Sequence, residues 1–443
     1  MLDYKLNEIR KKYLPSSLSE GMVFLLVIIF YALRDIPVLL YGGQVLAFGM
    51  ILWIKRGVRK RYTLSWLLFI CFAALSGIWA TNTTHYVKFI REISQGALLC
   101  VLFYACCDSE EKIEKTLRMI AAAALVMMVY FVIKTPWSEW SRAFHSTEAV
   151  SSSYDRFGRT IGYHPNSFGM LCAIELGCWL YQWRKTGKWT QLIWCAALLV
   201  LLLFSKSRTA FLFIGMLGVI YLLLEERDCR KILGRILLVG GLILAAFWLV
   251  MNIEPLYKLV GYRLTGAVSF LTNDGNIDAS VRERNKMISA GLDMFIKHPL
   301  LGVGARNYSN IAFAKYGIWA DVYAHSNLIE ILADFGLIGT LLYYIPRIWC
   351  LVRLFRLRKR ITDPQRLKCC AFLTAFVITN LITDYIYISF NNEAIQLVYT
   401  LCFAFACFGG ETAEERRAPV IPLKTWEGRK KHEQKVFPAG AAG

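Results

Sequence analysis

The chain has 443 residues, of which 56% are hydrophobic and 19% are charged, and its formal net charge at pH 7 is +19. Apolar runs of nearly membrane-spanning length recur from Met22 to Phe408, which excludes a soluble globule. Because these runs are continuous rather than alternating, as over residues 236–251, they also exclude a β-barrel. They predict an all-α fold, a polytopic membrane helical bundle.

About twelve membrane-spanning helices are expected from the apolar runs. In chain order they cover residues 20–34, 36–54, 62–80, 88–107, 119–133, 166–183, 190–204, 209–224, 236–253, 326–350, 369–384 and 393–408. The basic leader and the first apolar run also fit a signal peptide, but a second apolar run follows Arg34 and Asp35 at once and favours a retained hairpin. Residues 1–408 are therefore expected to form a single integral-membrane domain, with a basic, disordered cytoplasmic tail at 409–443.

The positive charges indicate how the chain is oriented. With the amino terminus inside, about two thirds of the 51 Lys and Arg residues fall in inward segments, including the clusters at 55–61 and 353–360. This asymmetry predicts that both termini are cytoplasmic. Topology and the anionic lipid bilayer account for the net charge, and no nucleic-acid-binding module is visible, so no nucleic acid partner is expected.

The cysteines follow the same topology. All thirteen fall in predicted spans or inward loops, so no disulfide framework is expected on the outer surface. No Cys/His cluster has metal-ligand spacing. The sequence therefore predicts neither a metal site nor another cofactor.

Two outward loops, 134–165 and 254–325, are long for a compact bundle, and loops of this size commonly carry function. The second contains its own helical pattern. From Ser280, the sequence SVRERNKMISAGLDMFIKHP places apolar residues such as Met287 and Met294 on one face. We expect an amphipathic helix that lies over the bundle and ends before the proline.

Arg208 lies in a short polar turn between two apolar spans, so its guanidinium is expected at the membrane interface. Ser207 can cap the next helix, whose amino end then offers free N–H groups beside the guanidinium and the hydroxyls of Ser205 and Thr209. Such a site suits a phosphate. The alternative is a snorkelling arginine that only fixes topology, but the positive-inside rule disfavours Lys206 and Arg208 in so short an outward turn.

Arg282 and Arg284 begin the amphipathic helix of the large loop. Either could close over the same anion, and two arginines from separate segments suit a diphosphate better than one. The alternative is that both are solvated, as loop arginines usually are.

His325 stands where the large outer loop re-enters the membrane. Ser326 or Asn327 can cap the incoming helix, and Asn327 with Glu330 has capping-box spacing. The positive helix end would disfavour the imidazolium, and a neutral imidazole can accept a proton from an attacking sugar hydroxyl. Glu330 and Asp334 share one helical face and should point to the bundle interior or to water, because carboxylates are costly in lipid.

These segments together carry a resemblance to a known family. The motifs are SKSRTAFL (205–212), S-x-x-x-R from Ser280, HPLLGVG (298–304) and AHSNLIEILADFGLIG (324–339). In order, spacing and sidedness they resemble the O-antigen ligase and polymerase superfamily of bacterial membrane glycan transferases.

The resemblance implies a reaction and a set of site residues. In that family, a glycan on undecaprenyl diphosphate is transferred to a sugar hydroxyl on the outer face of the cytoplasmic membrane, without a nucleotide sugar or a metal. The catalytic histidine matches His325, and the two diphosphate-binding arginines match Arg208 and Arg284. Arg282 is the rival assignment for the second arginine.

Two further matches are less direct. The segment RTIGYHPNSFG (159–169) resembles the family's entry to a middle span, which implies that Arg159 and Asn166 line the cavity. The family often has asparagine directly after the histidine, whereas here Ser326 separates His325 from Asn327. Ser207, Asn327 and Glu330 are also expected to support the site.

The resemblance leaves the acceptor open. We favour a polymerase of surface polysaccharide that joins lipid-linked repeat units, because nothing in the chain points to a lipopolysaccharide core. The alternative within the family is a ligase that attaches the glycan to lipid A-core or to another anchor. The alternative of another class is a lipid-linked glycan flippase or transporter, which is typically built from paired halves, and no internal repeat is visible.

Overall fold

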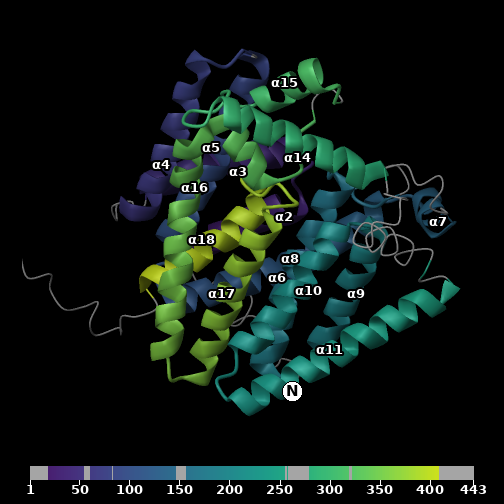
Figure 1. Ribbon diagram of the computed structural model, residues 1–443. Coiled ribbons are helices and arrows are strands. Elements are labelled where there is room, and N and C mark those ends of the chain that lie inside the picture. Colours follow the sequence, from purple (N-terminus) through teal and green to yellow (C-terminus); the bar gives the residue numbers. More distant parts are fainter. Residues whose placement is uncertain are drawn as a thin grey trace, which may run out of the picture.

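The computed structural model describes residues 18–53, 60–81, 83–145, 156–254, 257, 279–318 and 322–408. These residues form α-helices and short 3₁₀ turns, with no strand among them, so the all-α prediction is confirmed (Figure 1). In chain order the α-helices are α2 (Leu18–Ala32), α3 (Pro37–Trp53), α4 (Lys60–Leu75), α5 (Thr83–Cys106), α6 (Glu110–Lys134), α7 (Trp137–His145), α8 (Pro165–Thr186), α9 (Thr190–Ser205), α10 (Arg208–Leu224), α11 (Cys229–Asn252), α14 (Ala279–Lys297), α15 (Asn307–Tyr316), α16 (Asn327–Arg360), α17 (Pro364–Thr383) and α18 (Glu393–Phe408). The predicted tail at 409–443 lies outside the described residues.

Each predicted span falls on a helix of the structure. Among the described residues, five helical stretches are long and apolar enough to cross a membrane, namely Arg61–Ile78, His85–Cys106, Glu110–Lys134, Asn327–Arg360 and Pro364–Thr383. Five shorter apolar helices accompany them: Glu20–Ala32, Pro37–Ile51, Thr190–Ser205, Arg208–Leu224 and Glu393–Phe408. The chain is thus a polytopic, all-α membrane protein.

Several helices extend beyond the apolar runs from which they were predicted. α6 begins at Glu110 rather than near 119, because the hydroxyl of Ser109 caps it by accepting a hydrogen bond from the Lys112 N–H at 3.3 Å. α16 continues to Arg360 rather than 350, and its last turn carries three basic residues, which interact favourably with the negative end of the helix dipole. An apolar run therefore locates only the apolar part of a helix, whereas caps and charged residues decide how far the helix extends beyond it.

α8 lies inside the bundle, and its residues are buried from Phe168 to Trp179. α8 packs against α6, α9 and α10, and α17 packs against α10 and α16. α11 contrasts with these helices, since it extends away from the bundle in Figure 1 and exposes large apolar side chains such as Leu237, Leu244 and Trp248. In a membrane protein, such exposed apolar faces meet lipid tails.

α16 is interrupted at Gly336, whose φ of 59° and ψ of −161° are not helical. The loop before α15 fills the interruption. The N–H groups of Val303 and Gly304 donate to the carbonyls of Ala333 and Asp334 at 2.8 Å, and the N–H groups of Leu337 and Ile338 donate to the carbonyls of Pro299 and Leu300 at 2.8 and 3.2 Å. The backbone groups freed by the break are thereby satisfied, as a buried helix end requires.

Gly302 and Gly336 allow the two backbones to approach this closely. A Cβ on Gly302 would stand 2.4 Å from the carbonyl carbon of Asp334, and a Cβ on Gly336 would stand 2.5 Å from that of Leu300. Both glycines also have positive φ. The segment HPLLGVG is thus a structural element that docks the predicted outer loop against α16 at its interruption.

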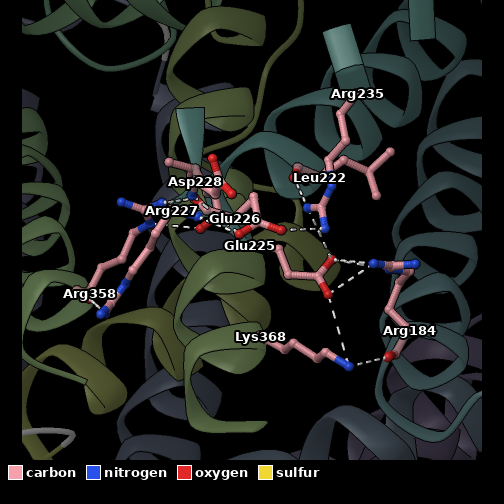
Figure 2. Close-up of polar contacts among 10 residues, drawn as sticks. Arg184, Leu222, Glu225, Glu226, Arg227, Asp228, Arg235, Arg358 and Lys368 are labelled. Carbon is pink, nitrogen blue, oxygen red and sulfur yellow. Dashed lines mark hydrogen bonds and ion pairs between the residues drawn. The ribbon is translucent and has the colours of Figure 1, made fainter. Parts of the chain in front are cut away.

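The opposite end of the bundle is held by a network of ion pairs and hydrogen bonds around the turn from α10 to α11 (Figure 2). Glu225 accepts two hydrogen bonds of 3.0 Å from the Arg184 guanidinium and lies 4.0 Å from the Lys368 ammonium. Arg358 donates to the carbonyls of Leu224 and Glu226 at 2.7 Å. This network connects the ends of α8, α10 and α16 with the start of α17.

Candidate active site

His325 occupies a strained position just before α16. Its φ of 54° is in the left-handed region, which is unusual for a residue with a side chain. Both neighbours are fixed: the Ala324 N–H donates to the Glu330 carboxylate at 2.6 Å, and the Ser326 hydroxyl accepts from the Ile329 N–H and donates to the Asp384 carbonyl, each at 3.3 Å. These contacts hold the chain on both sides of His325.

Ser326 therefore caps α16. The sequence allows either Ser326 or Asn327 as the cap, and the structure has Ser326, so the capping box of Asn327 with Glu330 does not form. The Glu330 carboxylate instead accepts from Ala324 and pairs with the Arg306 guanidinium at 3.4 Å. Glu330 thus fixes the loop that carries His325.

The imidazole of His325 packs against the Tyr323 ring, with centroids 4.2 Å apart and planes inclined by 45°. The pKa of His325 is lowered to about 4, chiefly by burial and then by electrostatic interaction with Arg284 and His164. The ring is therefore neutral near pH 7. Sequence analysis attributed this neutrality to the helix end, whereas burial is its largest cause in the structure.

Arg284 and Arg282 differ in their relation to His325. The charge of Arg284, a half-buried residue, adds to the lowering of the pKa of His325 by burial and offsets part of the rise that burial causes in the pKa of Tyr323, whereas Arg282 is exposed. Residues two apart on a helix face different directions, and Arg284 is three residues before the buried Met287. The geometry favours Arg284 over Arg282 as a residue of the site.

α14 itself matches the helix predicted from Ser280. Met287, Ala290 and Met294 are buried against α15 and the start of α16, together with Tyr308 and Ile329. In Figure 1, α14 and α15 lie across the top of the bundle. This packing holds Arg284 at the same end of the molecule as His325.

Arg208 is the first residue of α10 and is half-buried. Ser207 caps this helix as predicted, by accepting a hydrogen bond from the Ala210 N–H at 3.4 Å. The turn before it packs closely on α8, because a Cβ on Gly169 would stand 2.6 Å from the Ser205 hydroxyl and 2.7 Å from the Ser207 Cβ. The final glycine of the segment 159–169 thus allows the α9–α10 turn to reach the amino end of α8.

Arg156 is a residue that sequence reasoning missed. Its guanidinium donates to the Ser205 carbonyl at 2.9 Å, to the Lys206 carbonyl at 3.4 Å and to the Asn166 side-chain oxygen at 2.5 Å. It therefore connects the turn that precedes Arg208 to the start of α8. Only its place in the predicted outer loop could have drawn attention to it, and several other arginines share that property.

Asn166 and Arg159 have different surroundings. Asn166 accepts from Arg156, and its own N–H donates to the Nδ1 atom of His164 at 3.3 Å, so His164 caps α8. Arg159 is exposed on a 3₁₀ turn (η4, Arg159–Ile161). His164 is exposed, but partial desolvation lowers its pKa, and the charges of Arg156 and Arg159 add to this effect.

Asn327 is fully buried and holds the segment between α17 and α18 in place through hydrogen bonds. Its side-chain oxygen accepts from the N–H groups of Ser389 and Phe390 at 3.0 and 2.9 Å, and its amide donates to the Tyr344 hydroxyl at 3.0 Å. Its backbone N–H donates to the Tyr387 carbonyl at 3.1 Å. These contacts give Asn327 a role in stabilising the fold.

Asp334 has a comparable structural role. It is buried, and its carboxylate accepts from the backbone N–H groups of Arg306 and Tyr308 at 2.8 and 2.9 Å, at the start of α15. Together with Glu330 it explains why two acidic residues lie on one face of α16. Within the described residues, no group of three or more His, Cys, Asp or Glu side chains could hold a metal ion.

One family model matches part of this chain. Residues 192–344 match the family model Wzy_C, described as O-antigen ligase, over about a third of the chain. The match runs from α9 into α16 and includes Arg208, Arg284 and His325. It confirms the resemblance to the O-antigen ligase and polymerase superfamily. No curated protein matches the chain.

Proposed function

We propose that this chain, which carries an O-antigen ligase domain at residues 192–344, transfers a glycan from undecaprenyl diphosphate to a saccharide hydroxyl. The match supports a ligase- or polymerase-type function in glycan assembly, and the apolar helices support a multi-pass protein of the bacterial inner membrane. The site would face outward, with both termini in the cytoplasm. The observation that carries the proposal is that the matched segment contains Arg208, Arg284 and His325, with His325 directly before α16 and within electrostatic reach of Arg284.

Arg208 and Arg284 would bind the diphosphate of the donor. Guanidinium groups suit phosphate oxygens because they offer paired donors in a fixed plane. The amino end of α10 adds the positive end of a helix dipole beside Arg208. In the reaction, the bond between the anomeric carbon and the diphosphate oxygen breaks, the oxygen leaves with the electron pair, and the arginines stabilise the charge that develops there.

His325 would act as the general base. As the acceptor hydroxyl oxygen forms its bond to the anomeric carbon, its proton passes to the neutral imidazole. An in-line displacement of this kind inverts the anomeric centre. Since undecaprenyl diphosphate is a good leaving group, charge stabilisation and one base suffice for this chemistry.

Donor binding would also adjust the base. Without substrate, burial and the charge of Arg284 hold the pKa of His325 at about 4, which makes the imidazole a weak base. A diphosphate beside Arg284 brings negative charge to the same place and raises the pKa of His325. The imidazole would therefore become a better base only once the donor is bound.

The acceptor distinguishes the two family activities, and we favour the polymerase. The test is transfer by the purified protein in vesicles supplied with lipid-linked repeat units, followed by release of undecaprenyl diphosphate and by product length. Long chains on undecaprenyl diphosphate identify a polymerase, and glycan moved to another anchor identifies a ligase. If the wild-type protein moves the lipid-linked glycan across the vesicle membrane without releasing undecaprenyl diphosphate, a flippase replaces the transferase.

A further inference from the structure

His164 presents a single free hydrogen-bond donor. Its Nδ1 atom accepts the hydrogen bond from the Asn166 N–H at 3.3 Å, so this nitrogen carries no proton of its own. A neutral imidazole has one protonated nitrogen, which must then be Nε2. His164 is exposed, but its partial desolvation at the surface and the nearby charges of Arg156 and Arg159 lower its pKa and favour this neutral form.

The amino end of α8 lies beside the loop that carries His325. The Ser167 hydroxyl is 3.5 Å from the Tyr387 hydroxyl, and the Tyr387 carbonyl accepts the Asn327 N–H two residues after His325. His164 also acts electrostatically on His325. The two imidazoles therefore belong to one group of residues, contributed by α8 and by the start of α16.

The charges around His164 favour an anionic partner. Arg156 and Arg159 act on it from its own segment, and the amino end of α8 adds the positive end of a helix dipole. Arg284, on α14, acts electrostatically on His325, which belongs to the same group. A neutral N–H placed among cations binds an anion without adding charge repulsion, and a hydrogen bond to an ionised acceptor is stronger than one to a neutral acceptor.

We propose that the Nε2–H group of His164 donates a hydrogen bond to a non-bridging oxygen of the substrate diphosphate. This inference rests on the proposed function and assigns a residue that the family motifs did not identify. His164 would be a donor-binding residue, while His325 takes the proton of the acceptor. The tautomer fixed by the cap makes His164 unsuited to act as the base.

Two substitutions distinguish the proposed binding role of His164 from a purely structural role as the cap of α8. His164→Asn keeps a side-chain acceptor for the Asn166 N–H but removes the distant donor, because asparagine is a favoured N-cap with a short side chain. His164→Gln places an amide N–H at about the distance of Nε2 but gives a poorer cap. The exposed His298 provides a matched control as His298→Asn.

The experiment measures binding of undecaprenyl diphosphate, without glycan, to the purified full-length protein in detergent, together with the melting temperature. We expect His164→Asn to melt like the wild type and to bind roughly 10-fold to 100-fold more weakly, which is the size of one hydrogen bond to a charged group. His164→Gln should recover much of the affinity, and His298→Asn should bind like the wild type.

Two results overturn the inference. If His164→Asn binds undecaprenyl diphosphate as tightly as the wild type, His164 only caps the helix. If His164→Gln binds more weakly than His164→Asn, the cap rather than the Nε2 donor controls affinity. The proposed function fails separately, when the wild type binds undecaprenyl diphosphate but transfers no glycan from it.

Discussion

The charge of Arg284 on α14 lowers the pKa of His325, although 41 positions separate the two residues in the sequence and they belong to different elements. This relationship joins a cation suited to a diphosphate with a neutral imidazole suited to deprotonate a hydroxyl. It also makes the basicity of His325 depend on what Arg284 binds. Several measurements can test the consequences.

Replacing Arg284 should change the pH dependence of transfer. Arg284 disfavours the imidazolium, so Arg284→Gln raises the pKa of His325 in the free enzyme. Activity needs the neutral ring and is lost as the pH falls through that pKa, so the acid limb of kcat/KM moves to higher pH, by roughly one unit or less. The control is Arg282→Gln on the exposed side of α14, which should leave the limb in place.

Donor binding should move the same limb in the wild-type protein. The pH profile of kcat/KM reports the free enzyme, and that of kcat reports the complex with substrate. Because the diphosphate offsets the charge of Arg284, the acid limb of kcat should lie at higher pH than that of kcat/KM. Coincident limbs would show that the donor does not bind beside Arg284.

Replacing Arg208 should weaken transfer strongly. If Arg208 meets charge that develops on the leaving diphosphate, Arg208→Gln costs roughly 2–4 kcal/mol of barrier, which corresponds to about 30-fold to 1000-fold in kcat/KM. Arg208→Lys should recover only part of this loss, because lysine lacks the paired donors. Arg230→Gln, at an exposed position near the start of α11, is the matched control. Equal rates for Arg208→Gln and the wild type would reduce Arg208 to a residue that only fixes topology.

The interruption of α16 should be sensitive to a single methyl group. Gly302→Ala adds a Cβ at 2.4 Å from the Asp334 backbone and also strains a φ of 68°, so we expect a loss of stability of roughly 3 kcal/mol or more. Gly317→Ala has a similar φ of 61° but open space around the added Cβ, so it isolates the backbone strain, about 1 kcal/mol. The melting temperatures of the two variants in detergent should differ clearly, and equal values would contradict the close contact.

Asn327→Ala should lower stability without changing the pH profile. The substitution leaves the N–H groups of Ser389 and Phe390 without their acceptor inside the bundle, at a cost of roughly 2–4 kcal/mol. The folded fraction should retain the acid limb of the wild type, because Asn327 does not act on His325. A shifted limb at unchanged melting temperature would instead place Asn327 in the chemistry.

Sequence reasoning found the helices and the motif residues because both are local signals. Each span predicted from an apolar run falls on a helix, and the pattern from Ser280 located α14 and its buried face. The cap at Ser207 was likewise readable from the residues around it. Helix ends were less accurate, since α6 and α16 continue past the apolar residues on which the prediction rested.

Long-range backbone contacts could not be read in this way. The apolar run around Gly336 predicts a continuous helix, and only the docking of residues 299–304 makes an interruption stable. Asn327 has partners about 60 positions later in the chain, which no local spacing reveals. Arg156 was missed because its partners lie in the α9–α10 turn, and His164 because its proposed role depends on the contact of α8 with the loop that carries His325.

The central claim is tested most directly by the initial rate of glycan transfer by His325→Ala, with purified lipid-linked glycan and saturating acceptor. A general base contributes typically 10²-fold to 10⁴-fold, so we expect the rate to fall by about that factor while undecaprenyl diphosphate binds as tightly as to the wild type. Undiminished transfer by His325→Ala would contradict the account, because the acceptor proton would then have to leave by another route.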